Sequence, residues 1–302
     1  MNKKGIPVPL TELKIKTELK SKEGYMVMMK ICSTDSAIKN LITAISFTTD
    51  YDFAFRREGL YIVNTASESI KVIALLRADK IRTYNLAEEI TIRIAVKELK
   101  TLIKNSSEVT FYILKDDSRI NGLGDSKNGK VRTRSEQNLL HIMIKDSKMS
   151  TVIRYHLGFL EPKNYMSDVI LRNGEISFKK KFRISSMGFK KFFTPIKEIH
   201  GATVNLFFSN RTLSARGTFA STKVSQNMKE KKGVLEIISD IDPEEPVGYQ
   251  FQLVNLLSIK SCVSLSDSMI CRYDNNGFFV AEYKVGDFGI LQVILIGAAV
   301  RK

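Results

Sequence analysis

The sequence predicts an α+β fold built from two similar halves. The same order of elements, in which a strand, a helix, several strands, a second helix and further strands follow one another, occurs twice along the 302 residues. A period of about 150 residues is too long for a solenoid and indicates two related domains. Each half has few helices and many strands, which is an α+β pattern. The composition, 43% hydrophobic with six prolines, is that of a folded protein with a sizeable core.

The first half opens with a short apolar run, residues 25–32, which predicts a strand. Polar residues 33–36 supply N-cap side chains for a helix over 37–47, where Ile38, Leu41 and Ile45 recur at helical spacing. A second helix begins at Val96. Strands are predicted at 51–56, 60–64, 71–76, 90–95, 109–114, 139–144 and 151–156, and a basic loop at 116–137.

The second half repeats this order. A strand at 178–184 precedes a helix capped by Ser185 and Ser186, ended by Gly201 and containing Pro195, which is expected to kink or shorten it. A fourth helix is predicted over 251–260. Strands are expected at 203–209, 212–216, 235–241 and 269–273, a basic loop at 223–233, a turn at 243–246, and a final hairpin over 278–296.

These elements predict four segments. Residues 1–24 form a Lys-rich N-terminal extension, 25–156 the first domain, 157–176 a connector, and 177–302 the second domain.

The charge predicts a polyanionic partner. The chain carries 47 Lys and Arg against 32 Asp and Glu, a formal net charge of +15 with a pI near 9.6. Nucleic acid and an anionic membrane both fit such an excess, and a merely basic surface is the alternative. At this excess, nucleic acid is the preferred interpretation. No run approaches the roughly 18 to 20 apolar residues that span a bilayer.

The cysteines predict a reducing compartment. Cys32, Cys262 and Cys271 offer neither a disulfide framework nor a C-x-x-C metal pair. The N-terminus has no apolar segment typical of a secretory signal. We therefore expect the nucleus or the cytoplasm, and not secretion.

Several segments resemble the proliferating cell nuclear antigen (PCNA) family of sliding clamps. The matching sequence segments are SAIKNLITAI, EGLYIVNTASES and KVIALL within 36–76, VKELKTLIKNSS from Val96, FQLVNLLSIK from Phe251, and the hairpin EYKVGDFGIL from Glu282. Together they cover roughly 26–296 in order. The chain departs from the family at Ala66, where the family has an acid, and at 297–299, where the family has Ala-Pro-Lys. The chain is therefore similar to a divergent member of the family, and a viral origin is one interpretation.

The resemblance implies a DNA-clamp (processivity) fold, with antiparallel sheets and two helices in each domain, that closes into a homotrimeric ring. It implies a polymerase processivity factor that encircles double-stranded DNA without sequence specificity and tethers DNA polymerase and other replication and repair proteins, with a clamp loader among the partners. If the protein is viral, the viral replication site is the expected location. The alternatives are a monomeric viral polymerase accessory factor, a checkpoint-clamp subunit, a transcription factor, or an unrelated basic binding protein.

All four predicted helices carry lysine away from their apolar side, which predicts a DNA-binding surface. Solvated lysines are also ordinary on amphipathic helices, but acids are scarce here. Lysine attracts phosphate as a point charge, without the bidentate geometry of arginine, which suits sliding. The family's pore-facing positions favour Lys39, Lys104, Lys191 and Lys260. The full candidate set is Lys39, Lys97, Lys100, Lys104, Lys190, Lys191, Lys197 and Lys260.

The resemblance also implies a docking pocket for short clamp-binding peptides, between the connector and the C-terminal segment. A buried core role is the alternative for its apolar members. The corresponding residues are Ile70, Leu157, Phe159, Leu160, Pro162, Leu295, Gly297 and Ala298.

No catalytic, metal or cofactor site is predicted. His141, His156 and His200 are scattered, and no nucleophile elbow, phosphate-binding glycine loop or metal-ligand spacing occurs. We therefore expect a binding protein that is not an enzyme.

Overall fold

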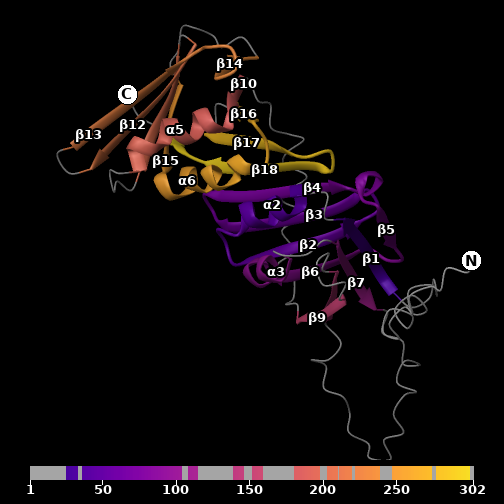
Figure 1. Cartoon of the computed structure of the whole chain (residues 1–302). Helices are drawn as coiled ribbons and strands as arrows, with labels where there is room; N and C mark the ends of the chain where they lie inside the picture. The colour runs from indigo at the N-terminus through magenta and orange to yellow at the C-terminus, as the bar shows by residue number, and fades with distance from the viewer. Residues whose placement is uncertain are drawn as a thin grey trace, which may run out of the picture.

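The computed structural model describes residues 25–32, 36–103, 108–114, 139–145, 152–158, 180–197, 203–209, 211–219, 222–238, 247–273 and 277–299 (Figure 1). The first half contains β1 (Tyr25–Cys32), α2 (Ser36–Ile45), β2 (Asp50–Arg56), β3 (Gly59–Ser67), β4 (Ile70–Arg77), the 3-10 turn η1 (Ala78–Lys80), β5 (Thr83–Leu86), β6 (Ile90–Ala95), α3 (Val96–Ile103), β7 (Glu108–Leu114), β8 (Leu139–Lys145) and β9 (Val152–Gly158).

The second half repeats this order of strands and helices. It contains β10 (Lys180–Ser185), α5 (Ser186–Lys197), β11 (Thr203–Ser209), β12 (Thr212–Phe219), β13 (Thr222–Lys229), β14 (Leu235–Ile237), β15 (Val247–Gln252), α6 (Leu253–Ser261), the 3-10 turn η4 (Cys262–Ser264), β16 (Ser268–Tyr273), β17 (Phe278–Val285), β18 (Gly289–Ile296) and β19 (Ala298–Ala299). The predicted α+β class is therefore confirmed. No helix among these is long and apolar enough to cross a membrane.

Several predicted boundaries were wrong. Most of the expected basic loop at 223–233 is strand β13. Along this strand half-buried residues, among them Val224 and Met228, alternate with exposed ones. The short strand β5 was not predicted, because none of its four residues is buried. Residues 251–252 end β15 and do not begin the helix, and the strand expected at 235–241 stops at Ile237. The loops at 116–137 and 243–246 and the helix stop at Gly201 lie outside the described residues.

The described strands form three antiparallel sheets. Sheet A has the order β5-β1-β7-β8-β9, sheet B the order β14-β10-β16-β17-β18-β4-β3-β2-β6, and sheet C the order β13-β12-β11-β15-β19. Sheet B contains strands of both halves, joined where β18 pairs with β4. Figure 1 shows β13 of sheet C and β9 of sheet A at opposite ends of the molecule.

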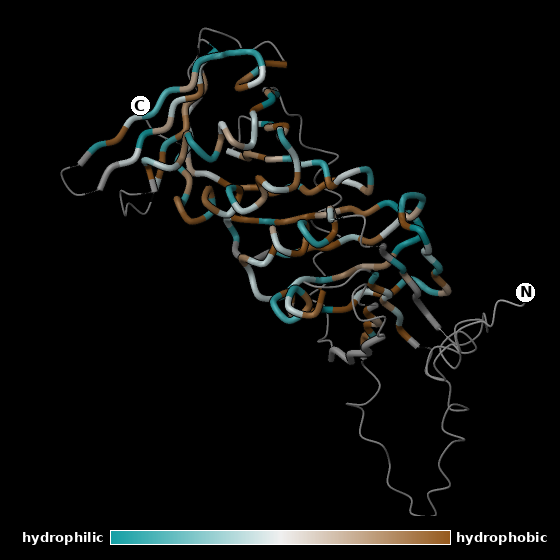
Figure 2. The backbone as a smooth tube through the Cα atoms, in the orientation of Figure 1, coloured by the Kyte–Doolittle hydropathy of each residue, from teal (hydrophilic) through white to brown (hydrophobic). Residues whose placement is uncertain are grey.

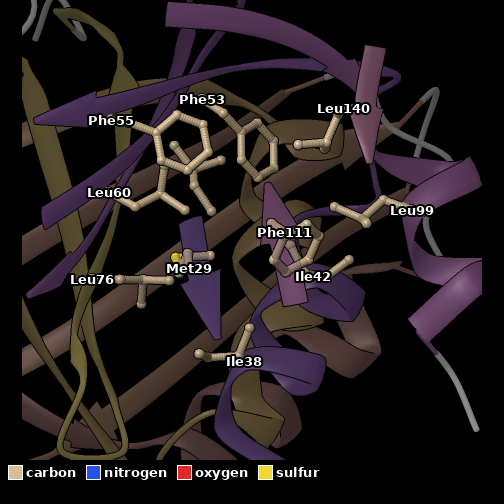
Figure 3. Close-up of a pocket in the computed structure, with 11 residues that line it drawn as sticks. Met29, Ile38, Ile42, Phe53, Phe55, Leu60, Leu76, Leu99, Phe111 and Leu140 are labelled. Atoms are coloured by element: carbon tan, nitrogen blue, oxygen red, sulfur yellow. The ribbon is translucent and has the colours of Figure 1, made fainter. Parts of the chain in front are cut away.

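Hydrophobic residues follow the strands of sheet B, while hydrophilic residues gather at the turns (Figure 2). In the first half, apolar side chains from α2 and from sheets A and B point toward one another, among them Met29, Ile38, Phe53 and Phe111 (Figure 3). The space between them is about 10 Å³, which is no larger than a water molecule. This region is the hydrophobic core and has no room for a ligand.

The junction of the two halves depends on a glycine. Gly289 of β18 pairs with Leu76 of β4, and a Cβ atom at Gly289 would lie 1.8 Å from the carbonyl oxygen of Leu75. We expect Gly289→Ala to lower the free energy of unfolding by about 3 kcal/mol, because the two strands must separate to admit the methyl group. Urea denaturation measures this change. Gly217→Ala is the control, since its Cβ would meet Ile196 at 3.4 Å, close to an ordinary contact. Equal stability of the two variants would contradict the expectation.

Candidate nucleic-acid interface

In the part of the chain that the structure describes, the helices follow one another in the order α5, α6, α2, α3 (Figure 1). Helix α5 contacts α6, the turn η4 links α6 to α2, and α2 contacts α3. The hydroxyl of Ser261 donates a 2.8 Å hydrogen bond to the carbonyl oxygen of Ala44, which ties the end of α6 to α2. The helices of both halves thus form one continuous layer, here called the helical layer.

Helices α2 and α3 are amphipathic. Their buried residues include Leu41, Ile45 and Leu99, which fixes the remaining sides of both helices toward solvent. On those sides Lys97 is exposed, while Lys39 and Lys100 are half-buried. The Lys100 ammonium donates a 3.1 Å hydrogen bond to the hydroxyl of Ser46, just beyond the end of α2.

Helix α5 begins at a serine cap, as the sequence predicted. The amide of Gly188 donates a 3.0 Å hydrogen bond to Oγ of Ser185, which satisfies a backbone donor of the first turn. Phe189, Phe192, Phe193 and Ile196 are buried beneath the helix. Pro195 lies near the end of α5, which continues to Lys197. Lys190 and Lys191 are exposed on the opposite side.

Helix α6 differs from the other three. Its second residue, Val254, is 65% exposed, and its lysine, Lys260, is half-buried. Asn255 is only 7% exposed, and its side-chain amide donates a 2.9 Å hydrogen bond to the hydroxyl of Ser69 in the β3–β4 turn. Nothing local in the sequence singles out Asn255, because its partner lies 186 residues away.

The burial patterns of the repeat show which lysines correspond. When the buried residues of α2 are aligned with those of α5, Lys39 corresponds to Lys190 and Thr43 corresponds to Thr194. In the same alignment of α3 with α6, Lys97 corresponds to Val254. Basic side chains of the helical layer therefore come mainly from α2, α3 and α5. Lys104 follows α3 and lies outside the described residues, as does the side chain of Lys197.

The expected docking residues fall into two groups. Ile70 and Leu295 are opposite each other in the β4–β18 ladder and are 4% and 0% exposed, so both belong to the core. Beside them, the Ile296 amide donates a 3.0 Å hydrogen bond to the Ser69 carbonyl, and a Cβ at Gly297 would meet the ring of Phe251 at 2.7 Å.

Ala298 is exposed and pairs with Gln250 of β15. Leu157 belongs to strand β9, where it pairs with Leu140, since this strand continues to Gly158. Phe159, Leu160 and Pro162 lie outside the described residues. Residues 69–70 and 295–297 are thus adjacent, as a shared pocket requires.

The titratable groups in the described strands and helices show no catalytic arrangement. Burial raises the pKa of the Cys262 thiol to about 12 and raises that of Cys271 further, so both stay protonated. The ring of His141 stacks on Tyr112 with centroids 4.9 Å apart. The described side chains contain no cluster of three metal-ligating residues. His156 lies in β9, and His200 is outside the described residues.

Comparison with known proteins identifies the fold. No family model matches the sequence, and no curated protein matches it. The structure is similar to the crystal structure of proliferating cellular nuclear antigen from Entamoeba histolytica, with a TM-score of 0.71 and 12% sequence identity. The match covers 90% of this chain and 99% of that one. The chain therefore has the fold of the PCNA sliding clamp.

Proposed function

We propose that the protein is a sliding clamp that encircles double-stranded DNA and tethers a polymerase and other replication or repair proteins to it. The observation that carries the proposal is the helical layer. It combines Lys39, Lys97, Lys190 and Lys191 on one side of a chain with the clamp fold and a formal charge of +15. Lysines spread over helix faces attract phosphates without reading bases, which supports binding that is independent of sequence and sensitive to salt.

The edges of the sheets support closure into a ring. By chain order, β18 and β4 correspond in the repeat to β9 and β13, respectively. Strands β18 and β4 pair antiparallel inside the chain, whereas β9 and β13 each end a sheet in the described part of the structure. Two complementary edges at opposite ends of one chain fit a head-to-tail contact between copies. Such a contact would pair two edges that otherwise stay open to aggregation.

The ring is tested by a proline scan of β13. Phe219 and Thr222 flank the β12–β13 turn, so alternation along the ladder directs the amide of Gln226 toward β12 and that of Asn227 toward the free edge. We expect Asn227→Pro to convert the oligomer to a monomer that keeps its fold, because proline removes only an outward donor of the edge strand. Gln226→Pro is the matched control and should destabilise the fold instead.

Sedimentation velocity measures the mass of each species against the 34.2 kDa chain. A trimeric wild type supports the clamp, and an electron micrograph should then show a ring with a central hole. A wild-type monomer would contradict the ring and favour a monomeric polymerase accessory factor. A trimer that survives both proline substitutions would contradict the assignment of β13 as the contact.

A further inference from the structure

We propose that the face of sheet C turned away from the helices binds single-stranded nucleic acid. In strand β11, Val204, Leu206 and Phe208 are buried toward the core, so Asn205 and Phe207 lie on the other face. Strand pairing places Arg216 of β12 and Gln250 of β15 beside Asn205 on this face. It is called the outer face of sheet C below, and it is separate from the helical layer.

The charge of the outer face suits a polyanion. Strands β11, β12, β13 and β15 contain no aspartate or glutamate, and their basic residues are Arg216, Lys223 and Lys229. All three lie on the outer face by register and are exposed. Around them the face carries mainly hydroxyl and amide side chains, such as Ser214, Ser225 and Asn227. A partner with regularly spaced negative charges would be attracted by these cations and would meet no carboxylate from these four strands.

A supported aromatic ring lies within this face. Phe207 is opposite Gly248 in the ladder, and a Cβ at Gly248 would come within 2.5 Å of the ring, so the ring lies directly on the glycine backbone. The guanidinium carbon of Arg216 is 5.0 Å from the ring centroid. Aromatic rings and guanidinium planes are the groups on which proteins stack unpaired bases. An intact duplex keeps its bases stacked on one another and offers none to this platform.

The exposed cations of the outer face attract phosphates, and its aromatic ring and guanidinium favour unpaired bases. Charge and stacking thus point to one partner, a single strand.

Fluorescence anisotropy of the full chain with a labelled single-stranded oligonucleotide tests the proposal. Arg216→Glu combined with Lys223→Glu should weaken binding by on the order of tenfold or more and should reduce the salt slope by about 1.4, which is about 0.7 for each phosphate that is no longer neutralised. Phe207→Ser should weaken it about tenfold because the base stacking is removed, with the salt slope unchanged. Lys80→Glu combined with Lys284→Glu is the control, because it makes the same charge change at exposed positions off this face.

The controls decide between a site and general electrostatics. Melting temperatures equal to wild type show that the variants fold. Equal losses of affinity in the control pair and in the Arg216 and Lys223 pair would overturn the proposal, as would single-strand binding that neither the charge variant nor Phe207→Ser weakens. Duplex binding should survive in both variants, since the helical layer is untouched. If the single-strand test fails, the clamp proposal is unaffected. If the protein does not bind duplex DNA, the proposal for the outer face of sheet C is unaffected.

Discussion

Replacing Lys39, Lys97, Lys190 and Lys191 together by alanine is expected to weaken duplex DNA binding by at least about 100-fold near physiological salt. Each phosphate that a lysine neutralises contributes a slope of about 0.9 to the dependence of log K on log salt concentration, so removing four such lysines changes the affinity by orders of magnitude. The four lysines come from α2, α3 and α5 and are exposed or half-buried. Their removal leaves the buried side of each helix unchanged.

The matched control removes equal charge elsewhere. Lys80, Lys231, Lys232 and Lys284 are all exposed and lie outside the helices of the helical layer. Their replacement by alanine should leave duplex binding within a fewfold of wild type. Anisotropy titrations at several salt concentrations measure both the affinity and the slope. If the two quadruple variants lose the same affinity, then net charge and not the helical layer attracts DNA, and the clamp surface is wrongly placed.

Arg93→Ala is expected to lower the free energy of unfolding by about 3–5 kcal/mol. Arg93 of β6 and Asp52 of β2 are opposite each other in sheet B, with Nε of Arg93 2.7 Å from Oδ1 of Asp52. Their side chains are 9% and 1% exposed. Removing the guanidinium leaves the carboxylate buried without this charge partner, and that desolvation is the cost.

Two further variants isolate the cause of this loss. Arg77→Ala removes an arginine that forms an ion pair with Asp79, and both side chains of this pair are more than half exposed. The urea concentration at which this variant is half unfolded should stay near that of wild type. Asp52→Val combined with Arg93→Leu removes both charges and should recover most of the stability lost by Arg93→Ala. If the double variant is as unstable as the single one, the packing of Arg93 and not the buried charge of Asp52 explains the loss.

Docking of partner peptides remains a proposal with a defined place. Ser69 and Ile70 lie against the segment 295–297, and Asn255 of α6 holds Ser69 through its side-chain amide. Helix α6 is therefore tied on one side to the β3–β4 turn and on another, through Ser261, to α2. This arrangement connects the expected docking region with the helical layer through α6.

Most elements were predictable because their signals are local. The helical spacing of Ile38, Leu41 and Ile45 predicted α2, and Ser185 predicted the start of α5. The two-fold order of strands and helices predicted two similar domains. Strand β13 was misread because its Lys, Ser, Gln and Asn residues resemble a loop, while its half-buried Val224 and Met228 are too few to stand out. Strand β5 had no buried residue to mark it.

The sequence by itself determined the α+β class, the repeat, the positive charge and the lysines on the helices, because each of these depends on residue type and near neighbours. Only the tertiary structure decided which distant residues meet. It placed Val254 where the repeat has Lys97, buried Ile70 and Leu295 in the β4–β18 junction, and brought Asn255 to Ser69. Contacts between residues far apart in the chain depend on how the strands pair, and no short stretch of sequence contains that information.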